Sequence, residues 1–402
     1  MTATSPPTAR ARRVLPSTLA AILPGIALLP PGPAVRARPA TQEAPPAREA
    51  AADTLPSLSP EAAAYLAEAL AIVRDHAYWS DSVEWTDLRR AAFDTSAGSR
   101  VPSDTYEAIR FVLASLGDRH SFLQLSADLR AREIERPRAR GLLDEDAGGG
   151  ASGFLPSPFS DRREPAGSLE TRGGRTLASV VIPRTGGLPL QEFADRVHAL
   201  VREQDAARPC GWIVDLRGNG GGNMWPMLAG IGPVLGESGE LGSFLGREGV
   251  FGRWYYADGE AGVHGVGAGE GFVGATVSGE PYELQGTPPV AVLVDGGTGS
   301  SGEAVAIAFR GRPETRLFGL PTGGVSTVND GFRLPDDANL VITIGLDADR
   351  TGRPYPREVR PDEIVERADT GPDAQFERAL GWLLGRPDCA GAHGLRPERR
   401  MP

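Results

Sequence analysis

The chain has 402 residues and a formal net charge of −10, and it contains 52 glycines and 35 prolines. This length predicts two domains or one large one, with enough chain to bury a sizeable hydrophobic core. The acidic balance, with no basic cluster in the part expected to fold, argues against nucleic acid as a partner. An aromatic content of only 6% also argues against a surface on which bases stack.

Residues 1–37 have the pattern of a signal peptide. Three arginines precede an apolar run at 14–29, which is too short and too interrupted by proline for a membrane-spanning helix, and Ala37 ends a small-residue cleavage site. We therefore expect an exported protein, periplasmic or extracellular, without a stable membrane span once the signal is removed. The alternative is a disordered tail on a cytosolic protein. Residues 38–57 are rich in Pro and Ala and predict a disordered linker.

The next two segments differ in periodicity. In residues 58–125 apolar side chains recur at helical spacing, around 59–74, 85–93 and 103–116, so we predict an N-terminal helical subdomain. Residues 126–175 are charged, rich in Gly and Pro and without a sustained period. This pattern predicts an irregular surface excursion, whose role the sequence leaves open.

Residues 176–385 alternate short apolar runs with amphipathic stretches, which indicates an α/β core. We expect right-handed βαβ crossovers to join the strands into a mostly parallel sheet. Residues 244–286 and 331–345 predict added hairpins. The predicted fold class is thus α/β: a mostly parallel sheet with βαβ crossovers, plus the N-terminal helical subdomain and β-hairpin additions. Residues 386–402 are expected to form a C-terminal tail.

Cysteine and histidine are scarce in this sequence. The two cysteines, Cys210 and Cys389, form either one disulfide or two unpaired thiols, and the sequence leaves this open because it does not give their distance. With no CxxC pair and only five histidines, few ligands are available for a zinc site. We therefore expect neither a metal nor a cofactor.

Two glycine-rich segments follow expected strands, where sites gather in open α/β sheets. At 295–303 (DGGTGSSGE), a tight turn would expose Ser300 at a helix N-terminus, which favours developing negative charge. The alternative is an ordinary strand-to-helix turn with serine as N-cap. At 215–223 (DLRGNGGGN), consecutive glycines let backbone amides approach an oxyanion. A phosphate loop is disfavoured because neither a Gly-Lys-Ser/Thr ending nor GxGxxG spacing is present.

A third segment, 117–122 (GDRHSF), ends the helical subdomain. A lone histidine is more often structural than catalytic, yet a serine nucleophile needs a base with a pKa near neutrality. The other histidines lie in expected amphipathic helices or in Gly-rich surface stretches. His120 is therefore the best candidate base.

These segments, together with 321–324 (PTGG), resemble the C-terminal-processing (tail-specific) serine peptidase family in that family's spacing. The resemblance covers roughly residues 60–370. The helical start, with Trp85 and 117–120 (GDRH), looks like the histidine-using branch that contains the tricorn core and nisin-resistance-type peptidases. The resemblance implies a core of the Clp/crotonase type and hydrolysis of peptide bonds in peptide or protein substrates.

The same resemblance implies roles for individual residues. The family's nucleophile falls on Ser300, and the base of the histidine-using branch falls on His120. Val325 stands where the lysine-dyad branch has its lysine, so a Ser–Lys dyad is excluded. The implied mechanism is an acyl-enzyme on Ser300, with the amides of Gly221 and Ser301 as oxyanion donors.

Two carboxylates are candidates for orienting His120. Asp118 is two residues away and can equally serve only to cap the turn. Glu358 roughly matches the position of a glutamate in tricorn-like enzymes and is the favoured candidate. Glu303, in the nucleophile motif, is expected to be structural.

Two other functions are compatible with parts of this pattern. The first is a catalytically silent protein on the same fold that binds an apolar ligand or a peptide, against which the intact Ser300 and His120 weigh. The second is an acyl-thioester enzyme of the crotonase class. It is disfavoured because nothing indicates an adenine-nucleotide site and because the N-terminus predicts export.

Overall fold

The computed structural model describes residues 58–134, 157–236, 238–267, 271–284, 286–368 and 370–390. The predicted signal peptide, the predicted linker and residues 391–402 of the predicted tail lie outside this part. None of its helices combines the length and the apolar character needed to cross a bilayer.

The N-terminal part is helical, as the periodicity predicts. Its elements are α1 (Pro60–His76), η1 (Ser80–Ser82), α2 (Trp85–Thr95), η2 (Pro102–Thr105), α3 (Tyr106–Ser115), strand β1 (Phe122–Gln124) and α4 (Ala127–Ile134). Ser59 caps α1 by accepting the amide of Ala62 at 3.1 Å. Helix α3 begins at Tyr106, later than the expected 103, because η2 forms a 3₁₀ turn at Pro102. The apolar faces of these helices pack into one core.

The α/β core contains a six-stranded sheet. Its order is β14 (Glu363–Ile364), β10 (Thr315–Gly319), β9 (Val290–Val294), β4 (Trp212–Asp215), β3 (Arg175–Val181) and β2 (Ala166–Arg172). Neighbours from β14 to β3 are parallel, and β2 is antiparallel to β3. This sheet is the mostly parallel one that the sequence predicts.

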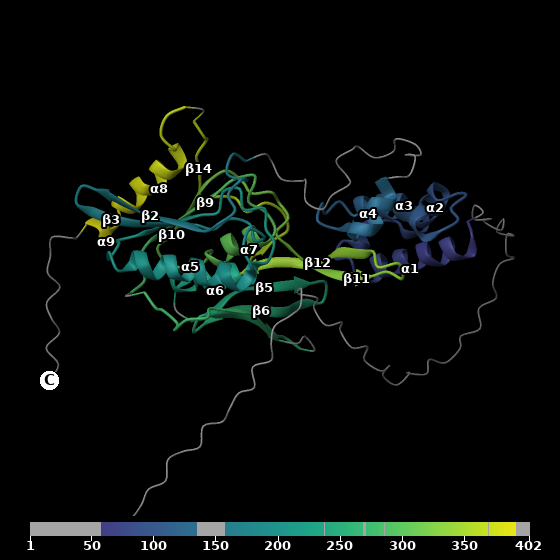
Figure 1. Cartoon of the computed structure of the whole chain (residues 1–402), viewed down its shortest axis with the longest axis horizontal. Helices are drawn as coiled ribbons and strands as arrows, with labels where there is room; N and C mark the ends of the chain where they lie inside the picture. The colour runs from purple at the N-terminus through teal and green to yellow at the C-terminus, as the bar shows by residue number, and fades with distance from the viewer. Residues whose placement is uncertain are drawn as a thin grey trace, which may run out of the picture. The chain divides into compact units, whose positions relative to one another are not determined.

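Helices cover both faces of this sheet (Figure 1). They are α5 (Leu190–Asp205), α6 (Met224–Leu235), α7 (Ser301–Ala308), α8 (Ala374–Leu384) and the short α9 (Pro387–Ala390). Trp212 and Val214 share a core with α5, α6 and α7, whereas Ile213 between them packs with α8 on the opposite face. This alternation is the period of two that a strand imposes on its side chains.

A second sheet corrects the expectation of a single mostly parallel one. Its eight strands are β1, β5 (Gly239–Gly246), β6 (Gly249–Ala257), β7 (Glu260–Gly265), β8 (Phe272–Thr276), β11 (Thr327–Arg333), β12 (Asn339–Asp349) and β13 (Pro354–Tyr355). All of its pairings are antiparallel. The cause is that the predicted hairpins pair with one another through β5 and β12 into a continuous sheet, instead of lying separately on the core.

Strand β12 links the helical part to the rest of the molecule. At its N-terminal end it pairs with β1, and Leu340 and Ile342 belong to the core of the helical part. At its C-terminal end, residues 346–349 pair with β5. The turn before β12 holds Asp336, whose carboxylate accepts hydrogen bonds from Tyr65 and Tyr106. One strand therefore joins the core of the helical part to the antiparallel sheet.

The predicted excursion at 126–175 is more ordered than expected. It contains α4 and β2, and residues 157–163 pack on the core; residues 135–156 lie outside the described part.

The two cysteines are bonded to each other, with Cα atoms 5.0 Å apart, which ties α9 to the residue two positions before β4. The open question about the cysteines is thereby answered in favour of a disulfide.

Candidate active site

Ser300 lies in a strained turn between β9 and α7. Its φ of 51° and ψ of −122° are unusual for a residue with a Cβ. The strand-to-helix turn of serine hydrolases places a nucleophile in the same way, on a sharp bend that exposes its hydroxyl. No hydrogen bond of Ser300 Oγ is found among the described residues. Ser300 is the N-cap residue of α7 and forms a capping-box pair with Glu303, whose carboxylate accepts its backbone amide.

Glu303 holds this turn from inside. It is fully buried and accepts the backbone amide of Ser300 at 3.0 Å. It also accepts the amides of Gly324 and Val325, both at 2.9 Å, and the hydroxyl of Thr322. Burial raises the pKa of Glu303, against the opposing effect of these hydrogen bonds. Glu303 thus joins the nucleophile turn to the segment 321–327, which agrees with the structural role expected for it.

The glycine-rich loop after β4 lies directly against Ser300. A Cβ added to Gly221, whose φ is +101°, would lie 2.8 Å from Ser300 Cβ and 3.1 Å from the amide nitrogen of Ser301. The Ser301 hydroxyl donates to the carbonyl of Gly222 at 2.9 Å, which fastens the loop to the start of α7. The fold therefore places Gly221 and Ser301, the two predicted oxyanion donors, beside Ser300.

The two predicted oxyanion donors differ in availability. The Gly221 amide donates to Asn219 Oδ1 at 3.0 Å, and Asn219 is fully buried, with its own amide group bound to the carbonyl of Ile182. The Ser301 amide makes no hydrogen bond to any described residue. Only the Ser301 amide is free as the structure stands, and the contribution of Asn219 has no signal in the sequence beyond its place in the motif.

His120 sits in the turn between α3 and β1. Its Nδ1 lies 2.6 Å from Thr327 Oγ1, and Asn329 donates to its carbonyl at 2.9 Å. Burial lowers the pKa of His120 to about 4, with Asp118 acting in the opposite direction. The imidazole is therefore neutral at pH 7 and able to accept a proton. If Nδ1 carries the hydrogen and donates it to Thr327, Nε2 is the acceptor.

Neither carboxylate considered for orienting His120 makes a hydrogen bond or an ion pair with its imidazole among the described residues. Glu358 pairs with Arg360 at 2.8 Å and makes no hydrogen bond or ion pair with His120 in the part of the chain described. Asp118 accepts the backbone amides of His120 and Ser121, so it caps the turn. The partner is instead the hydroxyl of Thr327, which is 207 positions away in the sequence and gives no local signal.

His120 contacts the segment 321–327 directly, whereas the amide of Ser300 is linked to it through Glu303, and no hydrogen bond joins Ser300 and His120 among the described residues. Glu303 binds this segment from the nucleophile side. From the base side, Thr327 contacts the imidazole and Arg119 donates to the carbonyl of Gly323 at 2.5 Å. Catalytic contacts are often longer without substrate, so this arrangement is compatible with a working pair.

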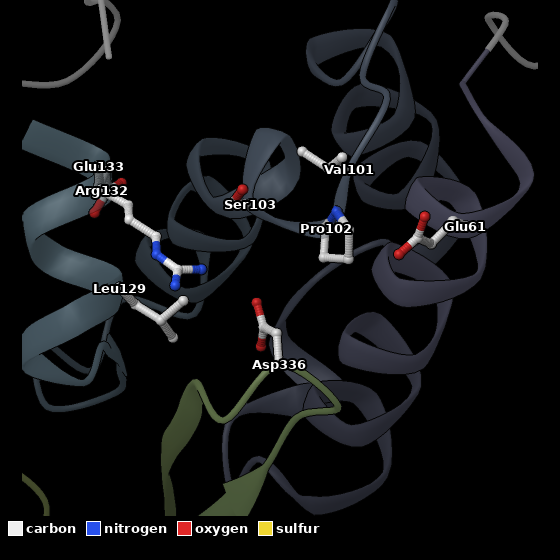
Figure 2. A pocket seen from close by; sticks show the side chains of 8 residues that line it. All are labelled: Glu61, Val101, Pro102, Ser103, Leu129, Arg132, Glu133 and Asp336. Atoms are coloured by element: carbon white, nitrogen blue, oxygen red, sulfur yellow. The ribbon is translucent and has the colours of Figure 1, made fainter. Parts of the chain in front are cut away.

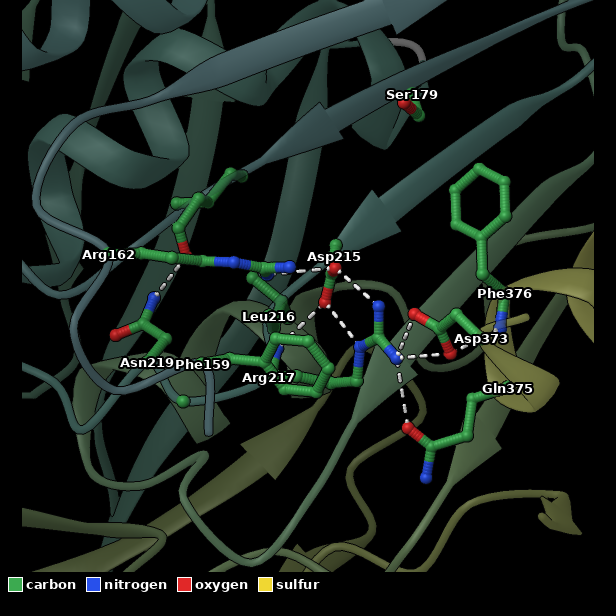
Figure 3. A network of polar contacts seen from close by, with 12 residues as sticks. Phe159, Arg162, Ser179, Asp215, Leu216, Arg217, Asn219, Asp373, Gln375 and Phe376 are labelled. Atoms are coloured by element: carbon green, nitrogen blue, oxygen red, sulfur yellow. Dashed lines mark hydrogen bonds and ion pairs between the residues drawn. The ribbon is translucent and has the colours of Figure 1, made fainter. Parts of the chain in front are cut away.

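A buried ionic network supports the base of the glycine-rich loop (Figure 3). Arg217, 2% exposed, pairs with Asp215 and with Asp373 at 2.8 Å, and it also donates to Gln375. Burial opposes ionisation of Asp215, but its contacts with Arg217 and Arg162 outweigh this and lower its pKa. Asp373 caps α8, so the network fixes the loop to the N-terminus of that helix.

A separate cavity of about 390 Å³ lies in the helical part (Figure 2). Its lining residues are Glu61, Val101, Pro102, Ser103, Leu129, Arg132, Glu133 and Asp336. None of the predicted site residues is among them.

Within the described ranges, no group of three or more His, Cys, Asp and Glu could hold a metal ion. The expectation of a reaction without metal or cofactor stays a prediction.

Comparison with known proteins gives the arrangement a context. The chain is 24% identical over 292 residues to the nisin-resistance protein of Lactococcus lactis subsp. lactis, covering 72% of this chain and 79% of that protein. It is 26% identical over 224 residues to a carboxyl-terminal-processing protease of Synechocystis sp., covering 54% of this chain and 46% of that protein.

A solved structure and a family profile point to the same class of protein as these two relatives. The solved structure of the photosystem II D1 C-terminal processing protease has a similar fold, with a TM-score of 0.52 at 17% identity, covering 82% of this chain and 98% of that one. Residues 177–365 match the profile of peptidase family S41. This span includes both β4 and β9 and the loops that follow them. Residues 177–365 thus form a domain of peptidase family S41, and the chain is a serine-type peptidase.

Proposed function

We propose that this chain hydrolyses peptide bonds through an acyl-enzyme on Ser300, with His120 as general base. The observation that carries the proposal is the strained φ of Ser300 beside Gly221 and the start of α7. His120 Nε2 takes the hydroxyl proton while Ser300 Oγ attacks the substrate carbonyl, and the protonated imidazole then returns the proton to the leaving amine. Water releases the acyl group in a second step by the same exchange.

The charge state of His120 supports its role as base. A pKa lowered to about 4 by burial keeps the imidazole neutral across the physiological range. The Thr327 hydroxyl, at 2.6 Å from Nδ1, holds the ring, and in the proposed mechanism it accepts the Nδ1 hydrogen, which leaves Nε2 unprotonated. We assign Thr327 the orienting role that the sequence alone favours for Glu358.

For the oxyanion, we propose the Ser301 amide as the donor that is ready and the Gly221 amide as the second. The Ser301 amide lies at the N-terminus of α7, where the helix dipole also favours negative charge. The Gly221 amide must exchange Asn219 Oδ1 for the substrate oxygen. One such donor typically contributes about 2.7–4 kcal/mol to lowering the barrier.

We further propose that the substrates are peptides or proteins and that the protein acts after export, in the periplasm or outside the cell. The family match supports the substrate class, and the signal-like residues 1–37 support the location. Nucleic acid is not an expected partner because the chain carries a formal net charge of −10.

The test is hydrolysis of an unfolded protein substrate, with the products identified by mass spectrometry. Wild-type protein should cleave it in the presence of a chelator, and Ser300→Ala and His120→Ala should not. A fluorophosphonate probe should label wild-type protein at Ser300. Cleavage that persists in Ser300→Ala would contradict the proposal, and absence of both cleavage and labelling in the wild type would favour a silent ligand-binding protein.

A further inference from the structure

We infer that Ser157 and Phe159 are positioning residues for the proposed reaction: they hold together the two loops that carry the nucleophile and the oxyanion donors. Both lie in the segment 157–163, between the described end of α4 and β2. The inference rests on the proposed function of Ser300. Its basis is a set of contacts from this segment to the loops at 215–222 and 295–300.

The first contact joins Ser157 to the nucleophile loop. Ser157 Oγ donates to Asp295 Oδ2 at 2.6 Å. Asp295 is 6% exposed, and its other oxygen accepts the amides of Gly218 at 2.9 Å and Gly297 at 3.0 Å. One carboxylate thus binds the loop after β4, the loop after β9 and Ser157. Removing the Ser157 hydroxyl takes away a donor from a buried anion that links these three segments.

The second observation is how closely the three segments pack. A Cβ added to Gly297 would lie 2.5 Å from Ser157 Cβ and 3.1 Å from Gly218 Cα. A Cβ added to Gly218, whose φ is +72°, would lie 2.5 Å from the carbonyl carbon of Phe159. No side chain fits at either position without displacement. The two glycines therefore allow the segment to touch both loops at their bases.

The third contact covers the ionic network of the glycine-rich loop. The guanidinium carbons of Arg217 and Arg162 lie 4.1 Å and 4.4 Å from the centre of the Phe159 ring. Arg162 also pairs with Asp215 at 2.8 Å, so Asp215 receives one arginine from each segment (Figure 3). Phe159 thereby shields from water the charges that fix the start of the loop.

These contacts matter for chemistry because of where the loops lead. Asp295 is five residues before Ser300, and Gly218 is three residues before Gly221. The relative position of nucleophile and oxyanion donor then depends on the distance between the two loop bases. A displacement of about 1 Å in such a pair can cost about a hundredfold in rate.

The experiment compares Ser157→Ala, Phe159→Leu and Phe159→Tyr with wild type and with Asp161→Asn. Asp161 lies in the same segment with its side chain fully exposed and is the matched control. The readouts are the rate of fluorophosphonate labelling at Ser300, kcat and KM for a peptide, and Tm. We expect labelling and kcat to fall about tenfold in Ser157→Ala and Phe159→Leu with KM within about twofold. Phe159→Tyr and Asp161→Asn should behave as wild type.

The outcomes separate the inference from the function on which it rests. If the wild type labels at Ser300 and the folded Ser157→Ala and Phe159→Leu variants label equally fast, the positioning role is wrong and the proposed function stands. A fall in Tm without a fall in the labelling rate also overturns it, because the segment is then only structural. A wild type that does not label overturns the proposed function first. Should either variant fail to fold, the other decides.

Discussion

The proposed nucleophile, Ser300, and the proposed base, His120, are held in different ways. Ser300 is held through its backbone: its amide is bound by Glu303, only three residues further along, and its turn starts from a buried strand of a parallel sheet. His120 is held through its side chain by one hydroxyl, that of Thr327, from a hairpin strand 207 positions away. The first arrangement is local and has many contacts, whereas the second is distant and has few.

This difference has a consequence for mutation. The nucleophile turn should keep its shape when single side chains on its surface change, because Glu303 alone makes four hydrogen bonds from inside. The base should lose its orientation when one hydroxyl is removed. Variants on the two sides can therefore test whether the site is as unequal as the structure indicates.

The largest effect is expected from Ser300→Ala. Loss of the proposed nucleophile should lower kcat by about 10⁴-fold or more, since the proposed acyl-enzyme forms on Ser300. Tm should hardly change, and Ser300→Gly should be more stable than Ser300→Ala because glycine relieves the positive φ. The checks are steady-state kinetics and thermal unfolding. If Ser300→Ala kept activity and Ser301→Ala lost it, the assignment of the nucleophile would be off by one residue.

The next effect is expected from Thr327→Val, which removes the hydroxyl bound to His120 and keeps the branched shape. We expect kcat to fall about 10- to 100-fold, because the imidazole is no longer held in one tautomer and orientation. Thr327→Ser should restore most of the activity. Glu358→Gln serves as the comparison and should change kcat by less than about twofold, since Glu358 pairs with Arg360. A greater loss in Glu358→Gln than in Thr327→Val would return the orienting role to Glu358.

A smaller effect is expected from Ser301→Ala. The variant keeps the backbone amide proposed as an oxyanion donor but loses the hydrogen bond to the carbonyl of Gly222. One hydrogen bond of this kind corresponds to about a two- to tenfold change in kcat. Kinetics at saturating substrate measure it. A loss comparable to that of Ser300→Ala would show that the Ser301 hydroxyl itself takes part in the reaction.

Asp347→Asn, on β12, is expected to have the smallest effect on activity, and its effect is measured instead as thermal stability at two pH values. Asp347 is buried, and its Oδ1 lacks a hydrogen-bond partner among the described residues. Its pKa is raised mainly by burial and, to a smaller extent, by the charge of Glu303. The native state therefore binds a proton that the unfolded state releases above a pKa of about 3.9, so wild-type stability falls as pH rises above that value. Asparagine cannot ionise, so the variant should have the higher Tm at pH 8 and a similar Tm at pH 4. A lower Tm at pH 8 would contradict this.

Sequence patterns predict much of the fold because the relevant signals are local. Apolar runs such as 290–294 and helical spacing such as 190–204 depend only on neighbours in the chain, and the structure has β9 and α5 there. The antiparallel second sheet was missed because pairing between β5 and β12 is a property of distant segments. The sequence does not predict α4 and β2, because Gly, Pro and charged residues obscure the short periodic stretches within residues 126–175.

The candidate site also combines features with a local sequence signal and contacts between distant segments. The Gly- and Ser-rich loops can be recognised in the sequence, because glycine is needed where Gly221 approaches Ser300. Three contacts could not be predicted: Thr327 with His120, Asn219 with the Gly221 amide, and Ser157 with Asp295. Threonine, asparagine and serine occur at many positions, and only the folded structure shows which of them contact the proposed site or the loops that carry it.

The central claim, that His120 activates Ser300, is tested most directly by the pH dependence of fluorophosphonate labelling at Ser300. The labelling rate of the wild type should fall on acidification with a midpoint near the His120 pKa of about 4, since only neutral imidazole accepts the proton. Asp118 raises this pKa, so Asp118→Asn should move the midpoint to lower pH. In His120→Ala the rate should fall by about 10³-fold or more and lose this limb. Labelling of His120→Ala at the wild-type rate with an unchanged pH profile would show that another group is the base.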